Sequence, residues 1–123
     1  VQGQPAAAHR ELDAFRDRLA ASCAADSLEF EDVAQRNFQW NELQGLVAMA
    51  EHRYEDAADH LKKAAGMADG WWICRSIKME RLEALVQLGR ADEARGLADA
   101  LLQVNPGLTG VRRLRARVEP TGG

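Results

Sequence analysis

The stretch Trp40–Pro106 contains NELQG at 41–45 and YEDAA at 54–58, then LEAL at 82–85 and LGRADEA at 88–94. Each pair places apolar residues three or four positions apart, which is the spacing of one face of a helix. A short polar or glycine-containing segment separates the members of each pair. The stretch therefore predicts two copies of one helical hairpin.

Composition favours one ordered, mostly helical domain. The chain has 123 residues, of which 46% are apolar, 28% are charged and only three are proline. That balance is typical of a folded globular domain that is large enough to bury a core. Ala, Leu, Glu, Arg and Asp dominate while β-branched residues are sparse, so intrinsic propensities predict an all-α fold.

Charge and hydropathy argue against several classes of partner. The net charge of −3 supplies no global attraction to nucleic acid or to an anionic membrane surface. No apolar run approaches the roughly 20 residues that a membrane-spanning helix needs. Because the sequence begins at Val1 rather than at Met, we expect a processed product or an excised domain, and the compartment stays open between cytoplasm and export.

Two segments precede the first hairpin. We expect a flexible leader at 1–8, because this segment is rich in Ala, Gly and Pro and shows no periodicity. A one-faced helix is predicted over about His9–Ala24. Its apolar stripe falls at three- and four-residue spacings and consists of Leu12, Phe15, Leu19 and Cys23.

A second helical pattern begins near Asp26. Asp26 and Glu29 have the spacing of a capping box, which predicts a helix start at this point. The pattern then either continues as one helix to about Glu51 or breaks near Asn37. The residues do not decide between these two readings.

The second half of the chain repeats the alternation of helix and break. We predict a break at Gly66–Gly70, a buried helix that begins at Trp71, and a left-handed end to that helix at Gly89. A further helix is predicted over about Ala91–Val104, and a short last helix over about Thr109–Val118.

These residues resemble tetratricopeptide repeats, which are helix-turn-helix units with small and large apolar residues at fixed places. In the first copy Gly45 lies where the family has a small residue on its first helix, and Tyr54 and Ala57 follow the turn. In the second copy Gly89 marks the turn and Pro106 closes the unit.

Two departures separate the copies from the family pattern. Ala57 and Ala94 are 37 residues apart, whereas the family period is about 34 residues. We therefore expect three extra residues between the copies, around Gly66–Trp72. In the second copy Leu82 replaces the small residue of the first helix.

The resemblance implies one domain built as a short right-handed stack of antiparallel hairpins. One hairpin cannot bury its own apolar faces, so the hairpins must stack and further helices must cap the ends. The implied parts are a domain over 9–118 with hairpins at about 38–68 and 71–104, caps at 9–36 and 109–118, and a flexible tail at 119–123.

The family binds extended peptides or partner helices in a groove lined by the first helix of each hairpin. Carried over by position, the groove residues are Gln39, Glu42, Leu46 and Met49 from the first copy and Ser76, Met79, Glu83 and Val86 from the second. The alternative is that the chain's own terminal helix fills the groove. Family members that clamp a C-terminal carboxylate use Lys and Asn where this chain has Glu42 and Leu46, so that activity is not expected.

Two further surfaces are candidates for contacts. Trp71 and Trp72 either fill the wider gap between the copies or expose one indole as an interface anchor, and Trp71 is expected to be the more exposed. Four arginines form the only dense basic patch, which is either a solvated face or a docking site for an acidic partner or phosphate. They are Arg112, Arg113, Arg115 and Arg117.

Cys23 and Cys74 are the only cysteines, and they do not have metal or redox spacing. Two buried thiols are expected, with a disulfide as the alternative in an oxidising compartment. His52, Asp56 and His60 are spaced by four, but His52 is predicted to lie in a turn, which removes the geometry of a metal site.

Neither an enzyme nor a cofactor is expected. No nucleophile, base and orienting group occur in plausible register, and there is no glycine-rich phosphate loop after a strand. The sequence instead predicts a non-catalytic interaction or scaffold module that binds a peptide or helix of a partner protein. The alternatives are a self-associating or spacer domain, and an accessory helical domain of a larger enzyme or of a secretion or transport machine.

Overall fold

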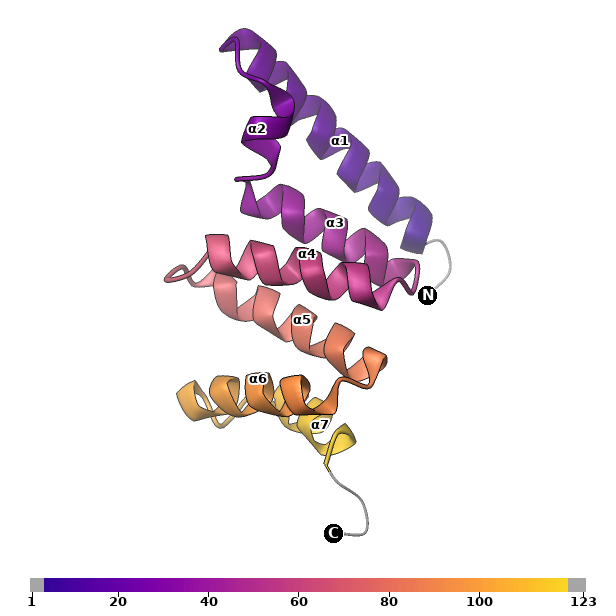
Figure 1. Ribbon diagram of the computed structural model, residues 1–123, viewed down its shortest axis with the longest axis vertical. Helices are drawn as coiled ribbons and strands as arrows, with labels where there is room; N and C mark the ends of the chain where they lie inside the picture. The colour runs from indigo at the N-terminus through magenta and orange to yellow at the C-terminus, as the bar shows by residue number, and fades with distance from the viewer. Residues whose placement is uncertain (1–3, 120–123) are drawn as a thin grey trace.

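The computed structural model describes residues 4–119, and within this range the chain is all-helical with no strand. The helices are α1 (Gln4–Ala25), α2 (Phe30–Ala34), α3 (Phe38–Ala50), α4 (Tyr54–Met67), α5 (Ile73–Leu88), α6 (Ala91–Val104) and α7 (Thr109–Arg117). They follow one another along the long axis, from α1 at one end to α6 and α7 at the other (Figure 1). The all-α prediction is confirmed. None of the described helices is long and apolar enough to cross a membrane.

The first helix begins earlier than predicted. α1 starts at Gln4 instead of His9, so residues 4–8 of the expected leader are helical. Three consecutive alanines at 6–8 explain the extension, because Ala has the highest helix propensity. The remainder of the predicted leader, 1–3, and the end of the predicted tail, 120–123, lie outside the described residues.

The predicted capping box at Asp26 and Glu29 is wrong. The Asp26 amide donates to the carbonyl of Ser22, 3.2 Å away, so Asp26 belongs to the turn that ends α1. Ser27 then adopts a left-handed conformation with φ of 58°. The next helix, α2, begins only at Phe30, and the side chain of Glu29 makes no capping hydrogen bond.

The break between α2 and α3 falls at Asn37, which confirms one of the two predicted readings. Asn37 Oδ1 accepts a hydrogen bond from the Trp40 amide at 2.9 Å and caps the start of α3. The buried side chain of Asn41 strengthens the corner, because its Nδ2 donates to the Asn37 carbonyl at 3.0 Å. The side chains of Asn37 and Asn41 thus hydrogen-bond to backbone groups at the break.

Aromatic rings hold the first two helices to the third. Trp40 of α3 stacks on Phe15 of α1 with ring centroids 6.4 Å apart, and it meets Phe30 of α2 edge-on at 5.5 Å. Offset stacks and edge contacts at such distances are favourable beyond the area that they bury. α1 and α2 therefore cover the start of α3.

Helices α3 and α4 pack against each other, as do α5 and α6, and α4 also packs extensively against α5. Their predicted boundaries are confirmed at Tyr54, where α4 begins, and over Ala91–Val104. Gly89 ends α5 with φ of 75°, as predicted. The pairs differ in tightness: α3 packs extensively against α4, whereas α5 packs less extensively against α6. Leu82, the bulky replacement in the second copy, is fully buried on α5.

The segment between the two pairs departs from the prediction. Gly66 is still helical, because α4 continues to Met67, and residues 68–72 make the connection. Trp71 and Trp72 precede the helix that they were expected to begin, since α5 starts at Ile73. Trp71 contacts Phe38 outside the helix, and Trp72 occupies the N-cap position just before α5.

Candidate functional site

The face of α3 and α5 that includes the predicted groove positions carries two open hollows. The first, of about 380 Å³, lies between α1 and this face, and its lining includes Glu11, Leu46 and Met49. The second, of about 260 Å³, lies between α5 and α7, and its lining includes Met79 and Leu114. Glu83 lines both hollows, so they adjoin.

The structure brings most of the predicted groove residues to this face. Five of the eight line the hollows: Leu46, Met49, Ser76, Met79 and Glu83. Of the other three, Glu42 interacts with Glu80 beside the second hollow, whereas Gln39 is exposed and lines neither hollow. Val86 packs against the core and is a structural residue.

The terminal helices form walls and leave the space between them open. Ala7, Ala8 and Glu11 of α1 border the first hollow, and Gly110 and Leu114 of α7 border the second. Neither helix fills the hollow that it borders. The space along α3 and α5 is therefore accessible from outside the molecule.

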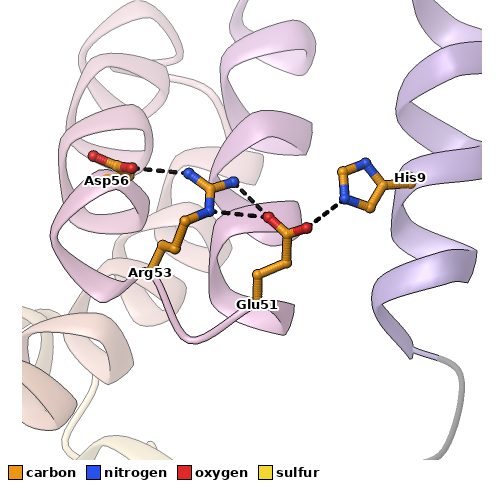
Figure 2. Close-up of polar contacts among 4 residues, drawn as sticks. All are labelled: His9, Glu51, Arg53 and Asp56. Carbon is orange, nitrogen blue, oxygen red and sulfur yellow. Dashed lines mark hydrogen bonds and ion pairs between the residues drawn. The ribbon is translucent and has the colours of Figure 1, made fainter.

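A chain of polar contacts fixes the wall formed by α1. His9 Nε2 lies 2.5 Å from Glu51 Oε2, just past the end of α3, and Arg53 Nη2 lies 2.7 Å from Glu51 Oε1 (Figure 2). Arg53 Nη1 continues the chain to Asp56 Oδ2 on α4, at 2.8 Å. The hydrogen bonds from His9 and then Arg53 lower the pKa of Glu51. These contacts tie three helices together at one end of the first hollow.

Glu80 is the most perturbed carboxyl group on this face. Burial, a hydrogen bond with Glu42 and the negative charges of Glu42 and Glu83 raise the pKa of Glu80 to about 8. Two ionised carboxylates offer each other no donor, so the hydrogen bond requires a proton on one of them, and the raised pKa assigns that proton to Glu80. Its buried Oε1 has no hydrogen-bond partner among the described residues.

The ionisable groups that line the two hollows are all acidic. They are Glu11, Glu80 and Glu83. The neutral lining includes the flexible side chains Met49 and Met79, which adapt to different surfaces. Sequence reasoning missed Glu11 and Glu80, although Ser76, Glu80 and Glu83 share one helical face by spacing. The site thus combines an adaptable apolar floor with acidic groups.

The tryptophan pair shows the reverse of the predicted order. Trp72 is 83% exposed and Trp71 is 63% exposed. The physical reason is the contact of Trp71 with Phe38 at the start of α3, where the ring centroids lie 5.8 Å apart. Trp71 therefore fastens the connecting segment to α3, and Trp72 is the indole presented to solvent.

The arginines of α7 do not form one uniform patch. Arg115 lies back against α6, where its Nε donates to Asp99 Oδ1 at 2.9 Å, and it also pairs with Glu119. The hydrogen bond with Asp99 is the main cause that raises the pKa of Arg115. The other three, Arg112, Arg113 and Arg117, are exposed.

The cysteines and histidines contribute no further site in the described part of the chain. Cys23 and Cys74 are both buried and free, so the alternative of a disulfide does not hold in this structure. Cys74 Sγ donates to the carbonyl of Ala65 at 3.3 Å. His52 lies in the turn before α4, with φ of 60°. Across residues 4–119, no three His, Cys, Asp or Glu side chains gather to hold a metal ion.

Comparison with known proteins adds no assignment: no family model matches the sequence, and neither the curated proteins nor the solved structures gave a match. The function must therefore be argued from the residues of this surface.

Proposed function

We propose that this chain is a non-catalytic interaction module, related in architecture to tetratricopeptide repeats, that binds a peptide or helix of a partner protein across α3 and α5. The observation that carries the proposal is the pair of adjoining hollows on this face, lined by five of the eight positions expected from the repeat pattern. Concave surfaces with an apolar lining and a few convergent polar groups are where binding sites usually occur.

The arrangement of the helices supports the repeat architecture. α3 and α4 form one antiparallel pair and α5 and α6 a second, while α1 with α2 and α7 occupy the two ends (Figure 1). In this architecture the first helix of each pair forms the binding face, and the capping helices border it. An amphipathic partner helix would present apolar side chains to Leu46 and Met79.

Leu46→Glu is expected to abolish binding of peptides selected on the wild-type protein, because it puts a charge on the apolar floor. Leu46 lines the first hollow and does not belong to the packed core, so the fold is expected to persist. The measurement is peptide selection by phage display, followed by titration of the selected peptides against wild-type and variant protein.

Leu28→Glu is the matched control, because Leu28 is an exposed apolar residue in the α1–α2 connection, outside both hollows. The control is expected to bind the selected peptides as the wild type does. When a selected peptide is added to the wild-type protein, the NMR chemical-shift changes of backbone amides should occur in α3 and α5. Peptides that bind Leu46→Glu unchanged, or that shift only amides of α4 and α6, would rule out this binding face.

A second candidate function is self-association, which the exposed edge beside the α4–α5 connection favours. Trp71, Trp72 and Val104 are large apolar residues with most of their surface exposed, and a hollow of about 200 Å³ there is lined in part by Leu101 and Val104. Exposed aromatic residues are enriched where proteins associate.

Sedimentation velocity over a range of concentrations tests this second function. A wild-type dimer that Trp72→Ser weakens by about tenfold would support it, since central aromatic anchors contribute at least ~1.4 kcal/mol. Leu28→Ser removes an exposed leucine from the α1–α2 connection and is the control. A wild-type protein that stays monomeric at the highest concentration excludes self-association.

A further inference from the structure

The acidic character of the α3–α5 face selects among partner segments. The ionisable residues that line its two hollows are Glu11, Glu80 and Glu83, with Glu42 beside Glu80. No Lys, Arg or His lines either hollow among the described residues. Complementary potentials steer association and disfavour partners of the wrong sign.

Glu80 supplies a second and separate observation. One of its oxygens, Oε1, is buried without a hydrogen-bond partner among the described residues. A buried acceptor without a donor is costly, so a ligand that brings a donor is favoured at this point. Its neighbour Glu42 is also an acceptor once ionised, so neither ionised group can donate to the other and an added donor is needed to satisfy both.

We propose that the segment bound on this face is basic, and that one of its Lys or Arg side chains lies between Glu80 and Glu42 with Glu83 beside it; this rests on the proposed function. Lys and Arg provide several N–H donors on one cationic head. The apolar part of the same side chain can lie against Met79 and Leu114, which line the hollow.

The cation replaces a proton. With no ligand bound, the proton on Glu80 makes the hydrogen bond to Glu42; when the cationic side chain enters, that proton leaves to solvent and both carboxylates accept from the ligand. The charged groups that act on Glu80 are Glu42 from α3 and Glu83 from α5 itself. On the α7 side the hollow is formed by Gly110 and Leu114, which do not titrate. No charge from α4 or α6 is among the causes that shift the pKa of Glu80 in the described chain.

Fluorescence anisotropy with three labelled amphipathic peptides tests the proposal. The peptides share one apolar Leu face and carry Lys, Gln or Glu at the remaining positions. The Lys peptide is expected to bind the wild-type protein at least about tenfold more tightly than the Gln peptide, and the Glu peptide more weakly than either. Between pH 6 and 8 the affinity of the Lys peptide is expected to rise, because the proton on Glu80 competes with the peptide and Lys itself keeps its charge.

Two double variants separate a local site from general attraction to a protein of negative net charge. Glu80→Gln/Glu83→Gln removes two carboxylates from the hollows and is expected to weaken the Lys peptide about tenfold and to abolish the rise with pH. Glu55→Gln/Asp59→Asn removes the same number of carboxyl groups from exposed positions of α4 and is the control, expected to change affinity less than about twofold.

Three other results of these binding measurements are possible, and each would contradict a specific part of the proposal. Equal binding of the Lys and Gln peptides overturns the basic partner and leaves the proposed function standing. If the two double variants weaken binding of the Lys peptide equally, net charge alone attracts the peptide. That result would contradict a local site at Glu80 and Glu42. Failure of all three peptides to bind overturns this inference, whereas failure of every peptide selected by display overturns the proposed function.

Discussion

Gly45→Ala is expected to destabilise the protein by about 1–3 kcal/mol, through overpacking between α3 and α4. A Cβ added at Gly45 would lie 2.7 Å from Leu61 Cγ and 2.9 Å from Leu61 Cδ2, closer than van der Waals contact allows. The Ala57 carbonyl oxygen would lie 3.4 Å away on the same side. Leu61 is 0% exposed, so it has no free space into which to move.

The same change at an open position is expected to have the opposite sign. Gly96 lies within α6, and an added Cβ would meet nothing within 4 Å. Gly96→Ala should therefore stabilise the protein by about 0.5–1 kcal/mol, because Ala is the better helix former. Urea unfolding of both variants measures the difference, and two stabilised variants would contradict the close approach of α3 and α4.

A double-mutant cycle assigns the cost to one contact. Leu61→Ala alone is expected to cost about 2–5 kcal/mol, since it removes a fully buried side chain. The cavity that it leaves can accept the methyl group that Gly45→Ala adds, so the double variant should be more stable than the sum of the two single changes predicts, by at least ~1 kcal/mol. Strict additivity would mean that the added methyl group meets something other than Leu61.

This contact also shows why the hairpins could be predicted from the sequence. Gly45 and Leu61 each lie on the face that helical spacing predicts to be buried, and a short turn joins their two helices, so local periodicity is enough to place them together. Where the second copy has Leu82 instead of glycine, the sequence indicated a departure, and α5 packs less extensively against α6 than α3 does against α4. The size of the residue at this position of the first helix thus indicated how extensively the two helices of each pair pack.

Other features depended on contacts between distant parts of the chain. The order of exposure of Trp71 and Trp72 follows from the position of Phe38, more than thirty residues earlier, which no local pattern contains. The missed role of Glu80 has the same origin, because Glu42 approaches it from another helix. The capping box predicted at Asp26 was also wrong. Asp26 belongs to the turn that ends α1, and the left-handed Ser27 follows it, so no helix begins there. The face of the site was predictable, but its electrostatics required the packed structure.

Glu80→Gln is expected to stabilise the protein at pH 8 by on the order of 1–2 kcal/mol. Burial and the neighbouring carboxylates raise the pKa of Glu80 to about 8, from an ordinary value of 4.5. The full shift would correspond to several kcal/mol, and it is reduced here because Glu80 is only partly buried and solvent screens the pair. A neutral amide avoids the cost of ionisation, and its N–H₂ can donate to Glu42.

The sign of the pH dependence follows from the direction of the shift. Between pH 4.5 and about 8 the folded chain holds a proton on Glu80 that the unfolded chain has lost. The folded state therefore binds more protons, and the contribution of Glu80 to wild-type stability falls as the pH rises through this window. His60 has the opposite dependence, because burial and then Lys63 lower its pKa, and its contribution is lost as the pH falls below 6.5. Comparing variant with wild type at each pH cancels His60.

Two measurements decide this prediction. The stability difference between Glu80→Gln and wild type should grow from pH 5 to pH 8 and then level off, and the carboxyl carbon of Glu80 should titrate near pH 8 by NMR. Glu42→Gln is the informative second variant, because it removes the neighbouring charge and gives an ionised Glu80 a donor, so the pH dependence should become smaller while the larger effect of burial remains. Glu55→Gln reports the effect of net charge alone. A carboxyl that titrates near 4.5 would show that Glu80 carries no proton at neutral pH, and the exchange of proton for cation on binding would then be excluded.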